Sequence, residues 1–188
     1  MSEKMNISTI AGFCNEQALC KLLVDLASNQ IECNPPKWMV PAPEFVMVDG
    51  DDFKIDANGV KKQTTEFYPP EGSNDYAEAS FVWSLGALVC YASSGHYVFG
   101  GRGGAYQHDN PDVDLPTLRK EHSALTPIVK RCLCFSPSER ISLKELRDLA
   151  VKGLESNNQM SRLKRSIESS EMIDSPECIE EVWSEKMV

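Results

Sequence analysis

Apolar residues occupy nearly every turn of one stretch near the middle of the chain, residues 81–91. Such a pattern is typical of a helix that is buried on all sides. Residues 75–92 contain no proline and a single glycine, so the sequence predicts one helix over this range. We expect Asp75 to cap its first turn, with Glu78 reaching back, and the Ser-Ser-Gly at 93–95 to end it.

Amphipathic patterns predict further helices on both sides of this central one. Residues 15–27 follow a helical period, and Asn15 is a suitable N-cap. A shorter helix is expected over residues 128–135. Ser142 and Glu145 have the spacing of a capping box and predict a last helix that closes the globular domain. The inward positions are Leu19, Leu22, Leu23 and Leu26 in the first helix, and Leu143, Leu146, Leu149 and Ala150 in the last.

A β-hairpin is expected between the first and the central helix. Residues 33–44 contain four prolines and cannot form regular structure. They are followed by two short apolar runs, 45–48 and 53–56, on either side of an acidic turn at 49–52. The expected fold class is therefore mainly α with one small β-hairpin.

Composition and charge narrow the classes of function. The chain has 188 residues, enough for one domain over 1–153 and a polar, acidic tail over 154–188. A net charge of −9 argues against nucleic acid and anionic lipid and permits a basic partner. No apolar run reaches the roughly 18 residues of a membrane span, and the first residues lack a signal-peptide core, so we expect no membrane insertion. The seven cysteines are scattered, which is typical of reduced thiols in a cytoplasmic protein.

Three short motifs follow one another in the order and spacing of a protein kinase. Pro-Pro-Glu at 69–71 precedes Val-Trp-Ser-Leu-Gly at 82–86, and an arginine motif, Ser-Pro-Ser-Glu-Arg, follows at 136–140. They resemble the end of the activation segment, the central helix and the closing motif of a kinase C-terminal lobe. The resemblance implies a buried ion pair between Glu71 and Arg140 and a structural role for Trp83.

The catalytic residues of a kinase have no counterpart in this sequence. Aligned on the hairpin, the His-Arg-Asp motif falls on residues 38–40, of which the last is a valine, and the metal-binding asparagine falls on Phe45. Asp-Phe-Gly falls on 57–59, or one residue earlier if Asp56 is included. The aspartate that braces the catalytic loop is replaced by Phe81. Because phosphoryl transfer needs a base, a metal ligand and a phosphate-binding lysine, we expect no enzyme, no cofactor and no ATP binding.

A kinase C-terminal lobe without an N-terminal lobe or catalytic residues resembles the KIND domain, the kinase non-catalytic C-lobe domain of Spir actin nucleators and some signalling scaffolds. The stretches 7–10 and 14–18 are similar to the start of this domain. The resemblance covers about residues 7–152. It implies that an acidic groove captures a basic amphipathic segment of a partner protein. It also implies a cytoplasmic location and an association with the cytoskeleton.

The aspartates around the hairpin turn have two interpretations. An Asp-Gly turn is ordinary turn chemistry and needs no partner, which is the favoured interpretation. Alternatively, the carboxylates form a docking surface for a basic helix and speed its capture. These residues are Asp49, Asp51, Asp52 and Asp56. A second acidic patch, with Asp109, Asp112 and Asp114, is equally ambiguous.

Other candidate sites are weaker. The glycine-rich stretch 100–104 follows no strand and is expected to open no helix, so it lacks the context of a phosphate-binding loop and is interpreted as a mobile connection. His96, His108 and His122 have no metal-binding spacing, and we expect them on the surface or in loops. We therefore predict no metal site.

The end of the chain leaves two possibilities. Disorder is the default for a polar, acidic tail. The sharper hypothesis is a short helix whose stripe of Ile179, Val182 and Trp183 docks back or binds a partner. For the whole chain we expect a non-catalytic protein-interaction module. The alternative is a structural subunit held permanently in a larger assembly, and an enzyme ranks third.

Overall fold

The computed structural model describes residues 5–36, 38–56, 65–72 and 76–171, without the side chains of residues 163 and 166–171. Within these ranges the protein is mainly helical and has one small antiparallel sheet, which confirms the expected mainly α class with a small β element. The chain divides into two units, Met1–Leu154 and Glu155–Val188, close to the boundary expected at 153.

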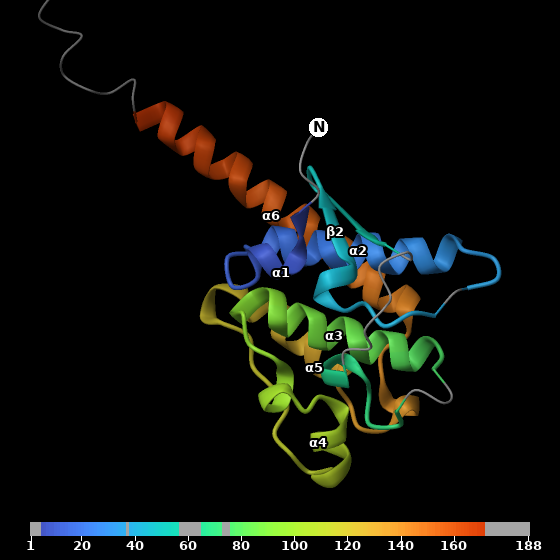
Figure 1. Ribbon diagram of the computed structural model, residues 1–188. Coiled ribbons are helices and arrows are strands. Elements are labelled where there is room, and N and C mark those ends of the chain that lie inside the picture. The colour runs from blue at the N-terminus through green and yellow to red at the C-terminus, as the bar shows by residue number, and fades with distance from the viewer. Residues whose placement is uncertain (1–4, 37, 57–64, 73–75, 172–188) are drawn as a thin grey trace, which may run out of the picture. The chain divides into compact units, whose positions relative to one another are not determined.

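Helix α3, Glu78–Ser94, is the centre of the first unit (Figure 1). Every side chain from residue 80 to residue 90 is buried, as the continuous apolar pattern predicts. The helix ends at Gly95, whose φ of 76° favours glycine and whose N–H donates to the Tyr91 carbonyl. Its start differs from the prediction. The N-cap is Ala77, without a side-chain cap, and the predicted cap, Asp75, lies outside the described residues.

Helices from both ends of the first unit cover α3. It contacts α2, Glu16–Glu32, and α5, Thr126–Cys132, and Figure 1 shows α4, Gly104–Asp109, on the side of α3 opposite α2. Gly86 makes the close contact with α5 possible, because a Cβ atom there would lie 2.7 Å from Cβ of Cys132. The apolar centre of α3 therefore depends on elements that are distant in the sequence.

The sheet contains the predicted hairpin and one strand more. Strands β2, Val46–Asp49, and β3, Asp52–Ile55, pair in the register Val46 to Ile55 and Asp49 to Asp52. Gly50 begins the two-residue turn with a φ of 62°, as tight hairpin turns require. Strand β1, Met5–Asn6, adds to the free edge of β2 and was not predicted. Two residues are too few for a period-two pattern to show in the sequence.

The remaining helices refine the sequence predictions. In α2 the Asn15 side chain accepts the Ala18 N–H at 2.8 Å, which makes it the expected N-cap. Helix α5 ends at Cys132 rather than near residue 135. The other helical segments are α1, Ile7–Ile10, and the 3-10 turns Pro43–Phe45, Thr65–Phe67, Val98–Gly101, Lys120–Leu125 and Pro137–Glu139.

The last helix, α6, runs from Leu143 to Glu171 and is longer than predicted. Residues 154–171 are helical, so the expectation of a disordered tail is wrong for this part. The stretch lacks proline, and its glutamates, lysine and arginines are good helix formers. At the start of α6, the Ser142 hydroxyl accepts the Glu145 N–H at 3.2 Å. The Glu78 carboxylate of α3 accepts the Leu143 N–H at 2.9 Å, so a residue from another helix completes the cap.

Candidate interaction site

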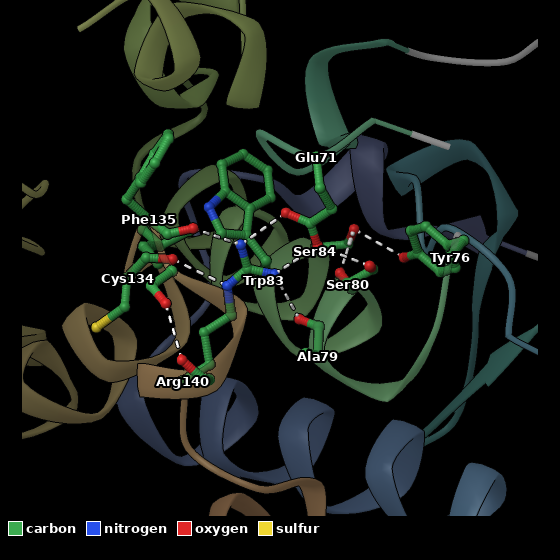
Figure 2. Close-up of polar contacts among 12 residues, drawn as sticks. Glu71, Tyr76, Ala79, Ser80, Trp83, Ser84, Cys134, Phe135 and Arg140 are labelled. Carbon is green, nitrogen blue, oxygen red and sulfur yellow. Dashed lines mark hydrogen bonds and ion pairs between the residues drawn. The ribbon is translucent and has the colours of Figure 1, made fainter. Parts of the chain in front are cut away.

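The ion pair implied by the kinase resemblance is present between Glu71 and Arg140 (Figure 2). The two terminal nitrogens of the guanidinium each lie 2.7 Å from a carboxylate oxygen of Glu71. Its remaining N–H groups donate to the carbonyl oxygens of Ala79, Cys134 and Phe135 at 2.9–3.0 Å. The Arg140 side chain is fully buried, and all five of its donors have an acceptor.

Hydroxyl groups of α3 attach the preceding segment to the same centre. Ser80 donates to Glu71 at 2.7 Å. Ser84 donates to the Phe67 carbonyl at 2.6 Å and accepts from the Tyr76 hydroxyl at 2.8 Å. Burial acts to raise the pKa of Glu71, but the hydrogen bonds from Arg140 and Ser80 outweigh it and hold this pKa below its usual value. The carboxylate therefore remains charged inside the fold.

Trp83 connects three elements through one buried amide. Its indole N–H donates to Oε1 of Gln107 in α4 at 2.9 Å, and Nε2 of Gln107 donates to the Leu133 carbonyl after α5 at 2.7 Å. Sequence reasoning missed Gln107, because a glutamine in a short polar helix carries no signal of burial. The indole N–H of Trp83 and both polar atoms of the Gln107 amide thus have hydrogen-bond partners, as the donors of Arg140 do. We therefore interpret Trp83 and Gln107 as structural residues.

The residues that our sequence alignment placed at kinase catalytic positions are mostly packed hydrocarbon side chains. Phe45 is buried, and Val40 packs against the core. The ring of Trp38 lies 5.7 Å from the ring of Phe81, centroid to centroid, at an interplanar angle of 47°. The counterpart of Asp-Phe-Gly at 57–59 lies outside the described residues. Trp38, Val40 and Phe45 offer no base and no oxygen ligand for a metal, whereas Asp56, the first residue of the alternative alignment, carries a carboxylate and is described.

The glycine-rich stretch is a packing element. A Cβ atom on Gly103 would lie 2.3 Å from the Glu66 carbonyl oxygen, and one on Gly104 would lie 2.1 Å from the Pro69 carbonyl carbon. Gly104 also donates its N–H to the Tyr68 carbonyl at 2.9 Å. Our expectation that this stretch opens no helix is wrong, since α4 begins at Gly104. The glycines allow α4 to lie directly against the segment that precedes the central helix.

Three of the four hairpin aspartates gather at the turn. Asp49 and Asp52 face each other across the two strand ends, and Asp51 lies in the turn between them. Asp56 follows the opposite end of β3, where its N–H donates to the Phe45 carbonyl. Asp49 and Asp51 are exposed, and the side chain of neither forms a hydrogen bond or ion pair with another residue that the structure describes. We call Asp49, Asp51 and Asp52 the acidic turn.

A lysine of α2 fixes the acidic turn in place. Nζ of Lys21 lies 2.8 Å from Asp52 and 2.6 Å from Asp25, and Asp25 also accepts the Phe53 N–H at 2.9 Å. Partial burial acts to lower the pKa of Lys21, but its hydrogen bonds to Asp25 and Asp52 raise it overall. The hydrogen bond from Lys21 also lowers the pKa of Asp52. The carboxylates of Asp49 and Asp51 therefore stand on a turn that is tied to a helix.

The histidines require a correction. His96 and His108 are exposed, but His122 is only 3% exposed, and Nδ1 of its ring lies 2.7 Å from the Ser93 hydroxyl. We expected a surface or loop position; His122 lies in a short 3-10 turn between helices, but this turn packs it against the end of α3 and buries it. Ser93 is itself fully buried, so this pair offers no accessible nucleophile.

Thiols and possible metal ligands are the remaining candidate groups in the described chain. The six cysteines there are all free, and burial raises the pKa of the Cys90 thiol to about 12. No group of three His, Cys, Asp or Glu side chains among the described residues is arranged to hold a metal ion. Across the same residues, none of the helices has the length and apolarity to cross a membrane. Trp183 lies outside the described residues.

No protein-family model matches the chain, and no curated protein matches it.

Proposed function

We propose that the chain is a non-catalytic protein-binding module with the architecture of a kinase C-terminal lobe, of the KIND type. The contact between Trp38 and Phe81 carries this proposal. In the kinase alignment these positions hold the histidine of the catalytic loop and the aspartate that braces that loop. Two aromatic rings in contact stabilise the same junction without any ionisable group. The junction is thus suited to holding a shape and not to phosphoryl transfer.

The buried polar contacts support the same proposal. The Glu71–Arg140 pair is the contact that the kinase resemblance implies, and Trp83, expected to be structural, donates a buried hydrogen bond to Gln107. Removing one partner of such a pair is costly, whereas a buried pair adds little net stability. A chain with these buried contacts and with apolar residues at the catalytic positions has the shape needed to bind a partner. It lacks the side chains needed for phosphoryl transfer.

The acidic turn is the proposed binding surface for a basic amphipathic segment of a partner protein. Asp49 and Asp51 are exposed, and Lys21 fixes the orientation of the turn through Asp52. Exposed carboxylates of this kind attract Lys- and Arg-rich helices over about a Debye length and increase the association rate. The net charge of −9 also increases the attraction between the chain and a basic partner.

Capture of partners by the full chain, eluted with a salt gradient, tests this proposal. We compare the wild type with a double charge reversal, Asp49→Lys and Asp51→Lys. The matched control reverses the exposed Asp112 and Asp114. We expect a partner with a basic segment to elute at moderate salt, to be lost by the first variant and to be kept by the control. Retention by both variants would contradict the proposed surface.

One observation favours the alternative of a structural subunit. The side chains described between Glu155 and Arg165 are mostly exposed, and Met160 is 56% exposed. Bridging between folded domains is one use of a helix that is polar and exposed on all sides. The same capture experiment distinguishes the two functions. A large set of proteins that resists salt elution and ignores the charge reversals would favour the structural subunit.

A further inference from the structure

The last turns of α3 border a pocket of about 270 Å³. The helix contributes Cys90, Ser93 and Ser94, and the segments 96–99 and 116–119 complete the lining. A protein cavity of about 150 Å³ is enough to hold a benzene molecule, so this pocket has room for an aromatic ring with a short polar group. We call it the α3 pocket.

More than half of the residues that line the α3 pocket have apolar or aromatic side chains. Val98 and Leu118 are buried, and Pro116 lies next to them in the lining. Cys90 is only 6% exposed, and burial raises the pKa of its thiol to about 12, so the thiol stays uncharged at neutral pH. This part of the pocket therefore suits hydrocarbon.

Phe99, which also lines the α3 pocket, has a backbone conformation that bulky residues rarely adopt. Its φ is 52° and its ψ is 41°, in the left-handed region. A glycine, as at the next position, Gly100, would adopt this region without the cost that a side chain brings. The Phe99 ring stacks on the Tyr106 ring, with centroids 5.8 Å apart and an interplanar angle of 20°. The fold thus holds this ring beside the pocket at a conformational cost, as ligand sites often do.

Arg119 is the only Lys, Arg, Asp or Glu among the described residues that line the α3 pocket. Two main-chain carbonyls hold its guanidinium, because Nη1 donates to Gly12 at 2.8 Å and Nη2 donates to Ser94 at 3.4 Å. Ser94 lines the pocket and Gly12 does not, so Nη2 is the nitrogen on the pocket side. The side chain is 43% exposed and keeps further N–H groups for a ligand. A guanidinium held in this way is suited to a carboxylate.

Arg119 also has a carboxylate neighbour, Glu121. Its Oε1 lies 3.8 Å from Nη1, which is the nitrogen away from the α3 pocket, and this distance is too long for a hydrogen bond. The Glu121 side chain is 60% exposed, and ion pairs so exposed contribute little. Glu121 and Glu16 line a neighbouring pocket instead. An anion in the α3 pocket therefore meets one positive charge and no carboxylate from the described lining residues.

We propose that the α3 pocket binds a small aromatic carboxylic acid, whose carboxylate pairs with Nη2 of Arg119 and whose ring packs against Phe99 and Leu118. The volume limits the ligand to one ring and a short chain. The single charge selects an anion, and the buried apolar side chains favour a ring over further polar groups. The site is separate from the acidic turn. It goes beyond the binding function proposed above, and a failure of either proposal leaves the other standing.

Titration of the full chain with phenylacetate tests the site. Saturation-transfer difference NMR, with the acid raised to about 50 mM, gives the dissociation constant. We expect a value of about 1 mM, as for a ligand of about ten non-hydrogen atoms. Phenylacetamide has nearly the same shape without the charge, and we expect it to bind at least fivefold more weakly. The proposal is overturned if phenylacetate does not bind, or if the acid and the amide bind equally well.

Arg119→Gln removes the charge at the α3 pocket. We expect the dissociation constant of phenylacetate to rise at least tenfold, and that of phenylacetamide to change less than twofold, because the apolar lining is unchanged. Retained binding of the amide also shows that the pocket of the variant is folded. The matched control is Arg102→Gln, at a guanidinium that is 56% exposed and does not line the pocket. An equal loss in both variants would assign the effect to net charge and contradict the site.

A photoreactive analogue locates the ligand. On illumination the azide of 4-azidophenylacetate loses N₂, and the nitrene that remains inserts into a nearby C–H or N–H bond. Trypsin releases the two lining segments in the peptides 63–102 and 103–119. We expect adducts at residues 97–99 or 116–118, suppressed by excess phenylacetate. Adducts only at other positions, or adducts that excess phenylacetate does not suppress, would count against the α3 pocket.

Discussion

Glu71 and Arg140 lie 69 positions apart in the sequence, and their side chains form two hydrogen bonds of 2.7 Å. The guanidinium also donates to three main-chain carbonyls from two segments of the chain. This pair joins the segment that precedes α3 to the segment that precedes α6. It fixes their geometry because no other acceptor could replace the carboxylate without leaving buried donors unpaired.

Replacing Glu71 by glutamine should lower the free energy of unfolding by about 3 kcal/mol, because the buried Arg140 keeps its charge and loses its counter-ion. Urea denaturation measures the change. The control is Glu145→Gln, which breaks an ion pair with Arg131 whose side chains are about half exposed. We expect it to cost no more than about 1 kcal/mol. Equal losses of unfolding free energy in the two variants would show that the burial of Arg140 does not increase the cost of removing its counter-ion.

The same carboxylate should make stability depend on pH. Hydrogen bonds from Arg140 and Ser80 hold the pKa of Glu71 below its value in the unfolded chain. A lowered carboxyl pKa adds stability that is complete above the unfolded value, about 4.3, and is lost as pH falls through the folded value. Urea midpoints of the wild type and Glu71→Gln should therefore converge below about pH 4.5. A gap that stays constant down to pH 3 would contradict this assignment.

Trp83→Phe should destabilise the fold by about 2 kcal/mol, because the amide oxygen of Gln107 then stays buried without a donor. Thermal or urea denaturation measures the loss. Gln107→Met and the double variant complete a cycle with Trp83→Phe. We expect the double variant to lose less than the sum of the two single losses, since the two residues contact each other directly. Additive losses would indicate that the indole hydrogen bond contributes nothing.

Mg-ATP should leave the thermal midpoint of the protein unchanged. A ligand present at a hundred times its dissociation constant stabilises a protein by about 2.7 kcal/mol, so even weak nucleotide binding would be visible in a titration. The packed hydrocarbon at Val40, Phe45 and Phe81 offers no group for the nucleotide or its metal. A dose-dependent rise that Asp56→Asn abolishes would restore a catalytic interpretation.

Elements with a long and regular apolar pattern could be predicted from the sequence. The central helix, α2 and the β2–β3 hairpin were found because burial on one or all faces leaves a period in the residue order. The Glu71–Arg140 pair was inferred from motifs and not from any period. Strand β1 was missed because two residues carry no period, and the length of α6 was missed because its polar half has helix propensity without an apolar face.

The contacts of single polar residues could not be predicted. The partner of Gln107 lies 24 positions away, and that of His122 lies 29 positions away. Neither side chain occupies a position in an apolar pattern, so nothing in the sequence separates it from an exposed polar residue. The hydrogen bond from Arg119 to the Gly12 carbonyl also escaped prediction, because the two residues lie 107 positions apart and meet only in the folded chain.

The cap that Glu78 provides for α6 has a consequence for synthesis of the protein. Leu143 follows Glu78 by 65 positions, and Arg140 follows Glu71 by a similar interval. On the ribosome, α3, whose buried face is continuous, is therefore made well before α5 and the start of α6. We expect a nascent chain that stops before residue 140 to expose this helix and to bind chaperones, because it lacks the elements that cover the helix. Translation must pass residue 143 before the first unit can fold to completion.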